Sequence, residues 1–192
     1  MIDGSVRSFP ERRILLVNCD AGSQDGTPQL IEQRLGSGVR FWAVSHPVLS
    51  ASFKLLSESG VPGRETAVRI LAAVTDKLDA AVCLIVDGNV KSADAGWPQL
   101  LADPVLDKGV DCVLPWFHRN RYEGTLTNTL LAPLTGALYG KRIPCHLGGA
   151  YAFSSNMIRT VLLPQPWDDE IMQYGFDGWV TTLAVAEQLH TC

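Results

Sequence analysis

Asp87 and Asn89 follow directly after a run of apolar residues, Ala80–Val86. A continuous apolar run of this length predicts a buried strand of a parallel sheet, and open α/β sheets bind ligands at the carboxyl ends of such strands. A carboxylate and an amide oxygen at that place can hold a divalent metal ion and, through it, a diphosphate. The same residues also suit an ordinary Asp-Gly turn, so both interpretations remain open.

A second acidic residue, Asp20, stands in a polar turn after another apolar segment, Ile14–Val17. Asp20 is placed to contact the ribose or base of a nucleotide. Ser23, Asp25 and Thr27 then shape the turn into a helix, with Thr27 as N-cap and Pro28 at the first helical position. Taken alone, this segment also fits a turn with a cap, but two acidic strand ends in one parallel sheet favour a nucleotide site.

Three further segments carry groups that bind small anions or allow close approach of a ligand. Gly63-Arg64-Glu65 places a cation at a helix start, where a phosphate is attracted. Residues 118–128 combine basic and hydroxyl groups beside a predicted helix N-terminus, which suits a small carboxylate or phosphate. The glycines of segment 147–154 let the backbone approach a ligand. The alternatives are an exposed helix start, a solvated loop and a structural bend.

Several functional classes lack their signals in this sequence. The five cysteines are scattered without a CxxC pair, which predicts reduced thiols and a cytoplasmic protein. The four histidines have no metal-binding spacing. No GxSxG, GxGxxG or Walker loop is present. A net charge of −4 gives no reason to expect nucleic acid as a partner. Neither a membrane span nor a signal peptide is predicted.

The predicted elements that must position these residues alternate between strands and helices. Strands are expected at 14–17, 39–44, 80–86 and 110–115, and helices after residue 27 and at 64–78, 97–106, 127–139 and 181–189. Residues 45–62 are ambiguous, and 143–155 are expected to be irregular because they are rich in glycine. This alternation implies crossover connections and a parallel sheet in a single α/β domain.

Taken together, the motifs resemble those of glycosyltransferases with the GT-A fold, of a type similar to glycosyltransferase family 2. The segment 17–27 resembles their second-strand motif, and 85–92 resembles their metal-binding acid-x-acid segment. A more specific resemblance is to the retaining branch that includes glucosyl-3-phosphoglycerate synthase and mannosylglycerate synthase. It rests on segments 121–128, 133–142, 147–151 and 174–179. The resemblance covers residues 13–187 and implies a Rossmann-like three-layer sandwich with a mostly parallel sheet. It implies one domain over 1–192, with a nucleotide-sugar half at 13–115 and an acceptor half at 116–192.

The resemblance also implies an activity and roles for residues. The expected reaction moves a hexose from a nucleotide-diphosphate sugar to a small hydroxy acid of the glycerate or phosphoglycerate type, with Mg²⁺ or Mn²⁺, in cell-wall or compatible-solute biosynthesis. The nucleotide sugar would be bound by Asp20, Ser23, Arg64, Asp87, Gly148 and Gly149, and the metal by Asp87 and Asn89. The acceptor would be held by Arg119, Tyr122, Thr127, Asn128 and Tyr151, with Asp87 and Thr127 as catalytic residues.

The chain departs from the family pattern at two of these positions. The second metal-site acid is replaced by Asn89, and the acid after the paired glycines by Ala150, so a weak metal site is expected. The family's first strand and its late metal-binding histidine have no counterpart, which predicts truncation at both ends. The alternative function is therefore a degenerate nucleotide-sugar-binding module that acts with a partner. A nucleotidyltransferase is a third option, and homodimerisation would cover apolar surface.

Overall fold

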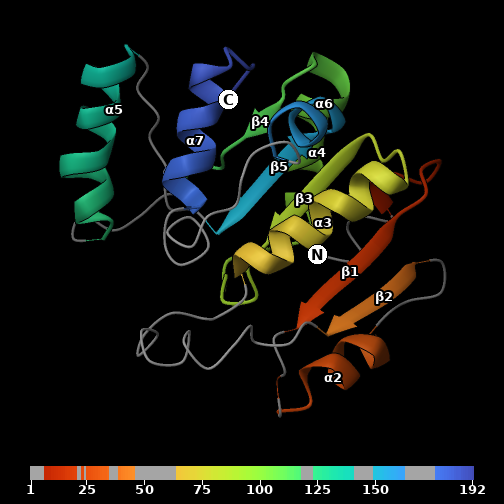
Figure 1. Cartoon of the computed structure of the whole chain (residues 1–192). Helices are drawn as coiled ribbons and strands as arrows, with labels where there is room; N and C mark the ends of the chain where they lie inside the picture. The colour runs from red at the N-terminus through yellow and green to blue at the C-terminus, as the bar shows by residue number, and fades with distance from the viewer. Residues whose placement is uncertain are drawn as a thin grey trace.

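The structure of the chain is a computed structural model that describes residues 7–20, 23, 25–34, 39–45, 64–117, 123–140, 149–162 and 176–192. Predicted features that fall between these ranges lie outside the described residues. They include the ambiguous segment 46–62, most of the basic loop at 118–122 and the first part of the glycine-rich segment, 143–148. The fold is a mixed α/β arrangement (Figure 1).

The first two strands form a parallel pair. β1 (Leu15–Asp20) and β2 (Arg40–Ser45) are joined through helix α2 (Thr27–Arg34), as the sequence predicts for a strand–helix–strand unit. The prediction of Thr27 as N-cap is wrong, because Gly26 supplies the first helical carbonyl, to the N–H of Leu30. The Asp25 carboxylate lies at this helix start, where its Oδ1 accepts the Thr27 backbone N–H at 3.0 Å and the Thr27 hydroxyl at 2.7 Å.

The other three strands are not parallel throughout. β3 (Val82–Val86) and β4 (Cys112–Val113) both pair with β5 (Ala150–Ser154), and both pairings are antiparallel. The expectation of a parallel partner for the apolar run at 80–86 is therefore wrong within the described residues. So is the expectation of an irregular segment over 150–154. Glycine ends before this stretch, and the alternation of alanine with Tyr151 and Phe153 suits a strand.

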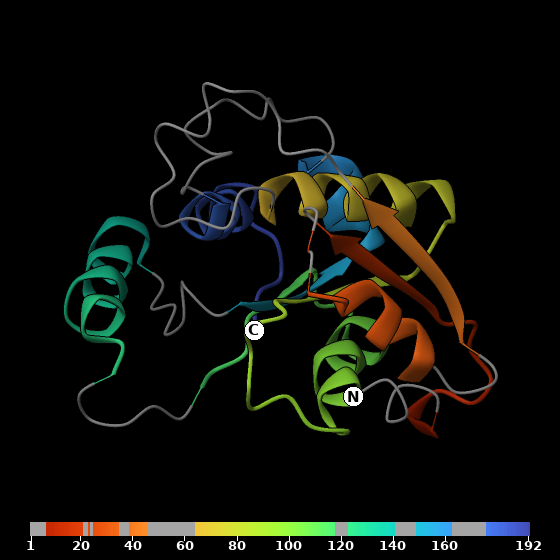
Figure 2. The ribbon, with the colours of Figure 1, turned by 90° about the horizontal axis from the view of Figure 1, so that it is seen from below.

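Helices cover both faces of the strand group β3–β5–β4, because successive side chains of a strand point to opposite faces. On one face Cys83, Tyr151 and Phe153 pack with α3 (Arg64–Lys77), η3 (Ile158–Leu162) and α7 (Phe176–Ala186). On the other face Leu84 and Ala152 pack with α4 (Trp97–Lys108). Helix α3 also packs against β1, which connects the two strand groups (Figure 2). The helices predicted at 64–78 and 97–106 are confirmed.

Two polar clusters fasten the end of β5 and the helices beside it. Asp111 accepts hydrogen bonds from the Ser154 hydroxyl, the Asn156 amide and the backbone N–H of His190. Burial alone would raise the pKa of Asp111, but these hydrogen bonds outweigh it and leave the pKa lowered. After β5 the chain continues into the single turn α6 (Ser155–Met157).

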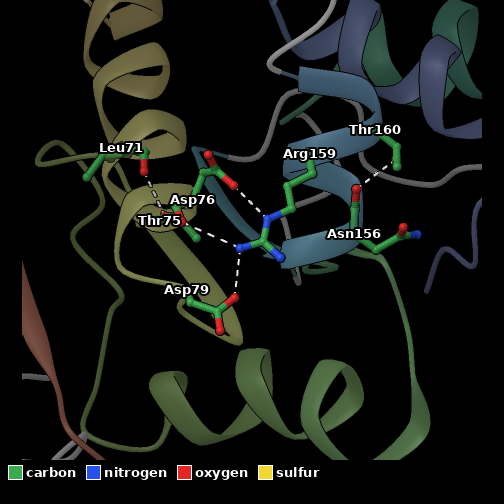
Figure 3. A network of polar contacts seen from close by, with 7 residues as sticks. All are labelled: Leu71, Thr75, Asp76, Asp79, Asn156, Arg159 and Thr160. Atoms are coloured by element: carbon green, nitrogen blue, oxygen red, sulfur yellow. Dashed lines mark hydrogen bonds and ion pairs between the residues drawn. The ribbon is translucent and has the colours of Figure 1, made fainter.

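The second cluster is centred on Arg159 of η3 (Figure 3). Its guanidinium binds Asp76 Oδ1 at 2.6 Å and Asp79 Oδ1 at 2.7 Å, which ties η3 to the end of α3. The Arg159 side chain remains 44% exposed, so the contribution of these ion pairs to stability is reduced by solvent.

The helix predicted at 127–139 is present and begins with a π-helical turn, η2 (Thr127–Leu131), followed by α5 (Ala132–Tyr139). The last helix, α7, starts at Phe176, five residues before its predicted start at 181. Among the described residues, the cysteines 19, 83, 112 and 192 are free thiols, and burial raises the pKa of Cys83 to about 11. No helix in the described ranges is long and apolar enough to cross a membrane.

Candidate functional site

Asp20 and Asp87 lie at the ends of two strands that point the same way. Asp20 is the last residue of β1 and Asp87 follows the last residue of β3. Figure 1 shows the arrows of these strands directed to the same edge of the molecule, and α3 packs against both. The two acids predicted from the sequence therefore follow strands that run in the same direction, although these strands belong to separate sheets in the described residues.

The Asp87 side chain is held in a tight turn. Its Oδ1 accepts the backbone N–H of Asn89 at 2.9 Å, and the N–H of Val90 donates to the Asp87 carbonyl at 3.1 Å. This is the Asp-Gly turn that the sequence offered as the alternative to a ligand site. However, Asp87 is only half-buried, and no hydrogen bond to its Oδ2 is found within the described ranges. The turn orients the carboxylate and leaves an oxygen for a ligand.

Gly149 is brought directly against this turn. The Asp87 N–H donates to the Gly149 carbonyl at 2.7 Å, which continues the β3–β5 register, where Val86 faces Ala150. The backbone of Gly149 has φ +66, and a Cβ built there would lie 3.3 Å from Val90 Cγ2 and 3.4 Å from Asp87 Cβ. Glycine is therefore required by both conformation and close approach. Two residues assigned from the sequence to the nucleotide sugar thus lie side by side.

The Asp20 carboxylate organises the other half of this edge. Its Oδ2 accepts the backbone N–H of Ser23 at 2.8 Å, so these two predicted nucleotide-binding residues are in contact. Asn18 precedes Asp20 by two residues and so lies on the same face of β1. Its amide nitrogen is buried and finds no hydrogen-bond partner among the residues that the structure describes. Sequence reasoning gave Asn18 no role, although a polar residue inside an apolar strand was the available signal.

Asp87 and Asn89 are the residues that could hold a metal ion. Asn89 is exposed, and its amide oxygen and the Asp87 carboxylate are the hard oxygen donors that Mg²⁺ and Mn²⁺ prefer. In the described part of the chain, no three His, Cys, Asp or Glu side chains gather closely enough to bind a metal by themselves. The donor set fits an ion that takes one or two protein oxygens and completes its shell with phosphate and water.

Residues assigned to the acceptor are distributed differently. Asn128 is exposed on η2, and its amide donates to the Glu123 carbonyl at 3.4 Å. Tyr151 is buried in the core, with its ring 5.6 Å from that of Phe153 and 5.8 Å from that of Phe176. Its role in acceptor binding stays a prediction. Arg119, Tyr122 and Gly148 lie outside the described residues, as do the side chains of Arg64 and Thr127.

Ala150, which stands where the resembled family has an acid, is the first residue of β5 and is fully buried. It pairs with Val86, the residue before Asp87. A carboxylate at this position would begin beside the Asp87 turn, whereas alanine contributes neither charge nor a hydrogen-bonding side chain. The polarity of the site therefore rests more heavily on Asp87.

The fold is similar to that of three solved structures. Glucosyl-3-phosphoglycerate synthase from Mycobacterium tuberculosis, in complex with phosphoglyceric acid, aligns with a TM-score of 0.52 and 20% identity over 82% of this chain and 62% of that one. The same synthase with Mn²⁺, UDP-glucose and phosphoglyceric acid gives 0.50 and 18% over the same shares. Another mycobacterial protein gives 0.52 and 21% over 80% of this chain and 47% of that one.

These similarities define a class of fold. The chain has the α/β fold of GT-A-type glycosyltransferases, which confirms the resemblance predicted from the motifs. It spans about three fifths of the synthase and about half of the other mycobacterial protein. No sequence-family profile matches the chain, and no curated protein sequence matches it significantly.

Proposed function

We propose that this chain is a retaining glycosyltransferase that moves a hexose from a nucleotide-diphosphate sugar to a small hydroxy acid of the glycerate or phosphoglycerate type. We further propose that it works in the cytoplasm as one GT-A-like domain with three layers, the nucleotide sugar binding to 13–115 and the acceptor to 116–192. The observation that carries the proposal is the junction of Asp87 with Gly149, on the side of the molecule toward which β1, ending at Asp20, also points.

The donor is the better supported half of this proposal. The solved synthase that shares this fold contains UDP-glucose in one of its structures. Asp20, fixed by the Ser23 N–H, lies on the β1 side of the edge and suits the nucleoside, whose hydroxyls donate to carboxylates. Gly149 gives a sugar diphosphate close access to the backbone beside Asp87. Arg64 at the start of α3 is assigned to the diphosphate, where a cation and a helix N-terminus act together.

The acceptor half rests on the motif resemblance. Thr127, with Arg119 or Tyr122 near it, is assigned to the carboxylate or phosphate of the acceptor, since charged and hydroxyl donors bind such anions strongly. Asn128 lies next to Thr127 in η2 and is exposed. Together with Gly148 and Tyr151 these residues would orient the acceptor hydroxyl toward the sugar, which lowers the entropic part of the barrier.

A divalent ion, Mg²⁺ or Mn²⁺, would be held by Asp87 and Asn89 and, when bound, would neutralise charge on the leaving diphosphate. The Asp87 turn fixes one carboxylate oxygen through the Asn89 N–H and leaves the other for the ion. Because Asn89 is neutral, we expect weaker affinity than a pair of carboxylates would give.

A specific observation also favours the second candidate, a nucleotide-sugar-binding module without activity. Asn89 and the fully buried Ala150 replace both acids that the resembled family has around Asp87. Loss of such charged contacts typically costs about 100-fold in rate for each 2.7 kcal/mol. Such a module would still bind the donor and would act through a partner protein.

Calorimetric titration with UDP-glucose and GDP-sugars, with and without Mn²⁺ or Mg²⁺, tests the proposal. The wild-type chain should bind one donor in a metal-dependent way. Asp87→Asn, which keeps an oxygen for the Asn89 N–H but removes the charge, should weaken that binding by about 100-fold. Asp94→Asn is the matched control, because Asp94 Oδ1 makes the same kind of contact, to the Gly96 N–H at 2.7 Å.

The outcomes separate the two candidates. Metal-dependent binding together with hexose transfer to glycerate or 3-phosphoglycerate supports the enzyme, and binding without transfer supports the module. If no donor binds under any metal condition, the proposed function is wrong. An equal loss in Asp87→Asn and Asp94→Asn would show that the Asp87 charge has no special role.

A further inference from the structure

Trp116 is the most exposed large apolar side chain among the residues that the structure describes. It follows β4 after Leu114 and Pro115, and 77% of its side chain is accessible to solvent. A packed indole typically covers about 150–250 Å² of surface, so this one leaves a large contact area open. A single exposed apolar residue needs no explanation by itself, so its position relative to the candidate site decides what it can do.

The strand register places Trp116 level with Asp87. Leu84 of β3 and Val113 of β4 both face Ala152 of β5, which lies between the two strands. Three residues further along, β3 has led to Asp87 and the chain after β4 has reached Trp116. No turn or bend interrupts the chain between β4 and Trp116. The two residues therefore lie at matching levels on either side of β5, two strand spacings or roughly 10 Å apart.

The side chains of Asp87 and Trp116 also project to the same face of the sheet. Ile85 and Leu114, which precede them by two residues, both pack in the core that β5 shares with α3 and α7. Side chains two residues apart in an extended chain point the same way, so Asp87 and Trp116 are directed to that face. The next residue, Phe117, confirms the alternation, because its ring lies 5.6 Å from that of the first residue of α4, on the opposite face.

The end of β5 leaves the space between Asp87 and Trp116 open. Gly149, whose carbonyl accepts the Asp87 N–H, has no side chain, and Ala150 beside it is fully buried. No side chain from β5 therefore separates the carboxylate from the indole. A ring attached to a diphosphate at Asp87 can lie over this glycine and reach Trp116.

The order of the strands matches the order of groups in a nucleotide-diphosphate sugar. Figure 1 shows β1, which ends at Asp20, on the β3 side of the three-stranded sheet and β4 on the far side. A donor with its nucleoside at Asp20 and its diphosphate at Asp87 therefore extends its sugar toward Gly149 and Trp116.

We propose that Trp116 forms the apolar wall of the donor's sugar subsite, with its indole stacked against the C–H face of the hexose. This inference rests on the proposed function and deepens it by assigning a residue to the sugar. A hexose ring presents C–H groups on its faces and hydroxyls around its rim. The face of an aromatic ring carries negative charge that attracts such C–H groups, and ligand sites commonly combine an aromatic wall with a few polar groups. Trp116 therefore distinguishes a nucleotide sugar from the free nucleotide.

Calorimetric titration with UDP and with UDP-glucose, in the presence of Mn²⁺, tests this inference, and GDP with GDP-glucose serves if the wild type binds guanine nucleotides. Trp116→Leu keeps an apolar side chain but removes the ring. It should weaken UDP-glucose binding by about tenfold and leave UDP binding unchanged. Trp116→Phe retains a flat ring and should keep most of the affinity. Trp42→Leu is the matched control, since Trp42 is also exposed, at 46%, but lies on β2.

The outcomes distinguish failure of this inference from failure of the proposed function. UDP-glucose binding that is unchanged in Trp116→Leu, or that weakens equally for UDP, would overturn the inference and leave the donor site in place. A wild-type chain that binds neither nucleotide nor nucleotide sugar would overturn the proposed function, and the sugar subsite with it. Because Trp116 is exposed, its replacement should leave the urea unfolding curve unchanged, so a weakened affinity is not a loss of fold.

Discussion

Replacement of Gly149 by alanine should destabilise the chain for two separate reasons. At φ +66 a residue with a Cβ costs about 1–2 kcal/mol more than glycine. The new Cβ would also lie 3.3 Å from Val90 Cγ2 and 3.4 Å from Asp87 Cβ, and relief of such crowding costs about 1 kcal/mol. The total of roughly 2–3 kcal/mol corresponds to a fall in Tm of about 4–12 °C for a chain of this size.

Two other glycines separate these causes. Gly109 ends α4 at φ +65 with no atom within 4 Å of its Cβ position, so Gly109→Ala should show the conformational cost alone, about 1–2 kcal/mol. Gly178 lies inside α7 without a positive φ and with equally open surroundings. Gly178→Ala should therefore be as stable as the wild type or more stable, by up to about 1 kcal/mol.

Urea unfolding followed by circular dichroism gives the three free energies of unfolding. The expected order of stability is Gly178→Ala, then Gly109→Ala, then Gly149→Ala. The reasoning about close approach would be refuted if Gly149→Ala were no less stable than Gly109→Ala. The same variant should also weaken donor binding, because its Cβ would lie 3.4 Å from Asp87 Cβ and would disturb the Asp87 turn.

Three further perturbations follow from contacts described above. Arg159→Ala should lower the free energy of unfolding only slightly in urea titrations, because its ion pairs are exposed, and the loss should vanish in about 1 M salt; a loss insensitive to salt would contradict this. Asn89→Asp restores a second carboxylate in an exposed position, so calorimetry should show Mn²⁺ binding about tenfold tighter, and unchanged affinity would argue against a metal at Asp87. Asp111→Asn should be less stable than the wild type at pH 7. The pKa of Asp111 is lower in the folded chain than in the unfolded chain, where it is about 3.9. Ionised Asp111 therefore stabilises the folded chain above that pH, and this stabilisation is lost as the pH falls through the folded pKa. Urea titrations should show the difference in stability between Asp111→Asn and the wild type closing below about pH 4. A gap that does not narrow as the pH falls below about 4 would show that charge is not the cause.

Local signals in the sequence were enough to find most elements and the acidic edge. The helices at 64–77 and 97–108 follow from their apolar spacing, and Asp20 and Asp87 follow from apolar runs that end in polar turns. These features depend on neighbours in the chain, so one sequence contains the information. The contact of Asp87 with Gly149 also agrees with the motif assignment, although no pattern specified a hydrogen bond between them.

Features that depend on distant partners were not predictable in the same way. The strand at Ala150–Ser154 was expected to be irregular, and its antiparallel direction depends on pairing with β3 and β4 far away in the chain. An apolar run such as 80–86 has the same composition whether its partner is parallel or antiparallel. Likewise, residue preference predicts Thr27 as the cap of α2, but the helix already includes Thr27, and Asp25 Oδ1 accepts its backbone N–H.

The central position of β5 has a consequence for the order in which the chain folds. Among the described residues β3 pairs with β5 alone, and β4 has besides β5 only a parallel bridge from Cys112 to Thr191. β5 is synthesised about 65 residues after β3. During synthesis the apolar faces of α3 and α4 are therefore formed before β5, the strand that brings Tyr151 and Phe153 into the core. The entropy cost of closing so long a loop must be met before the contacts between these strands can stabilise the chain. We expect this half of the sheet to form late and to need protection from aggregation until residue 154 has emerged from the ribosome.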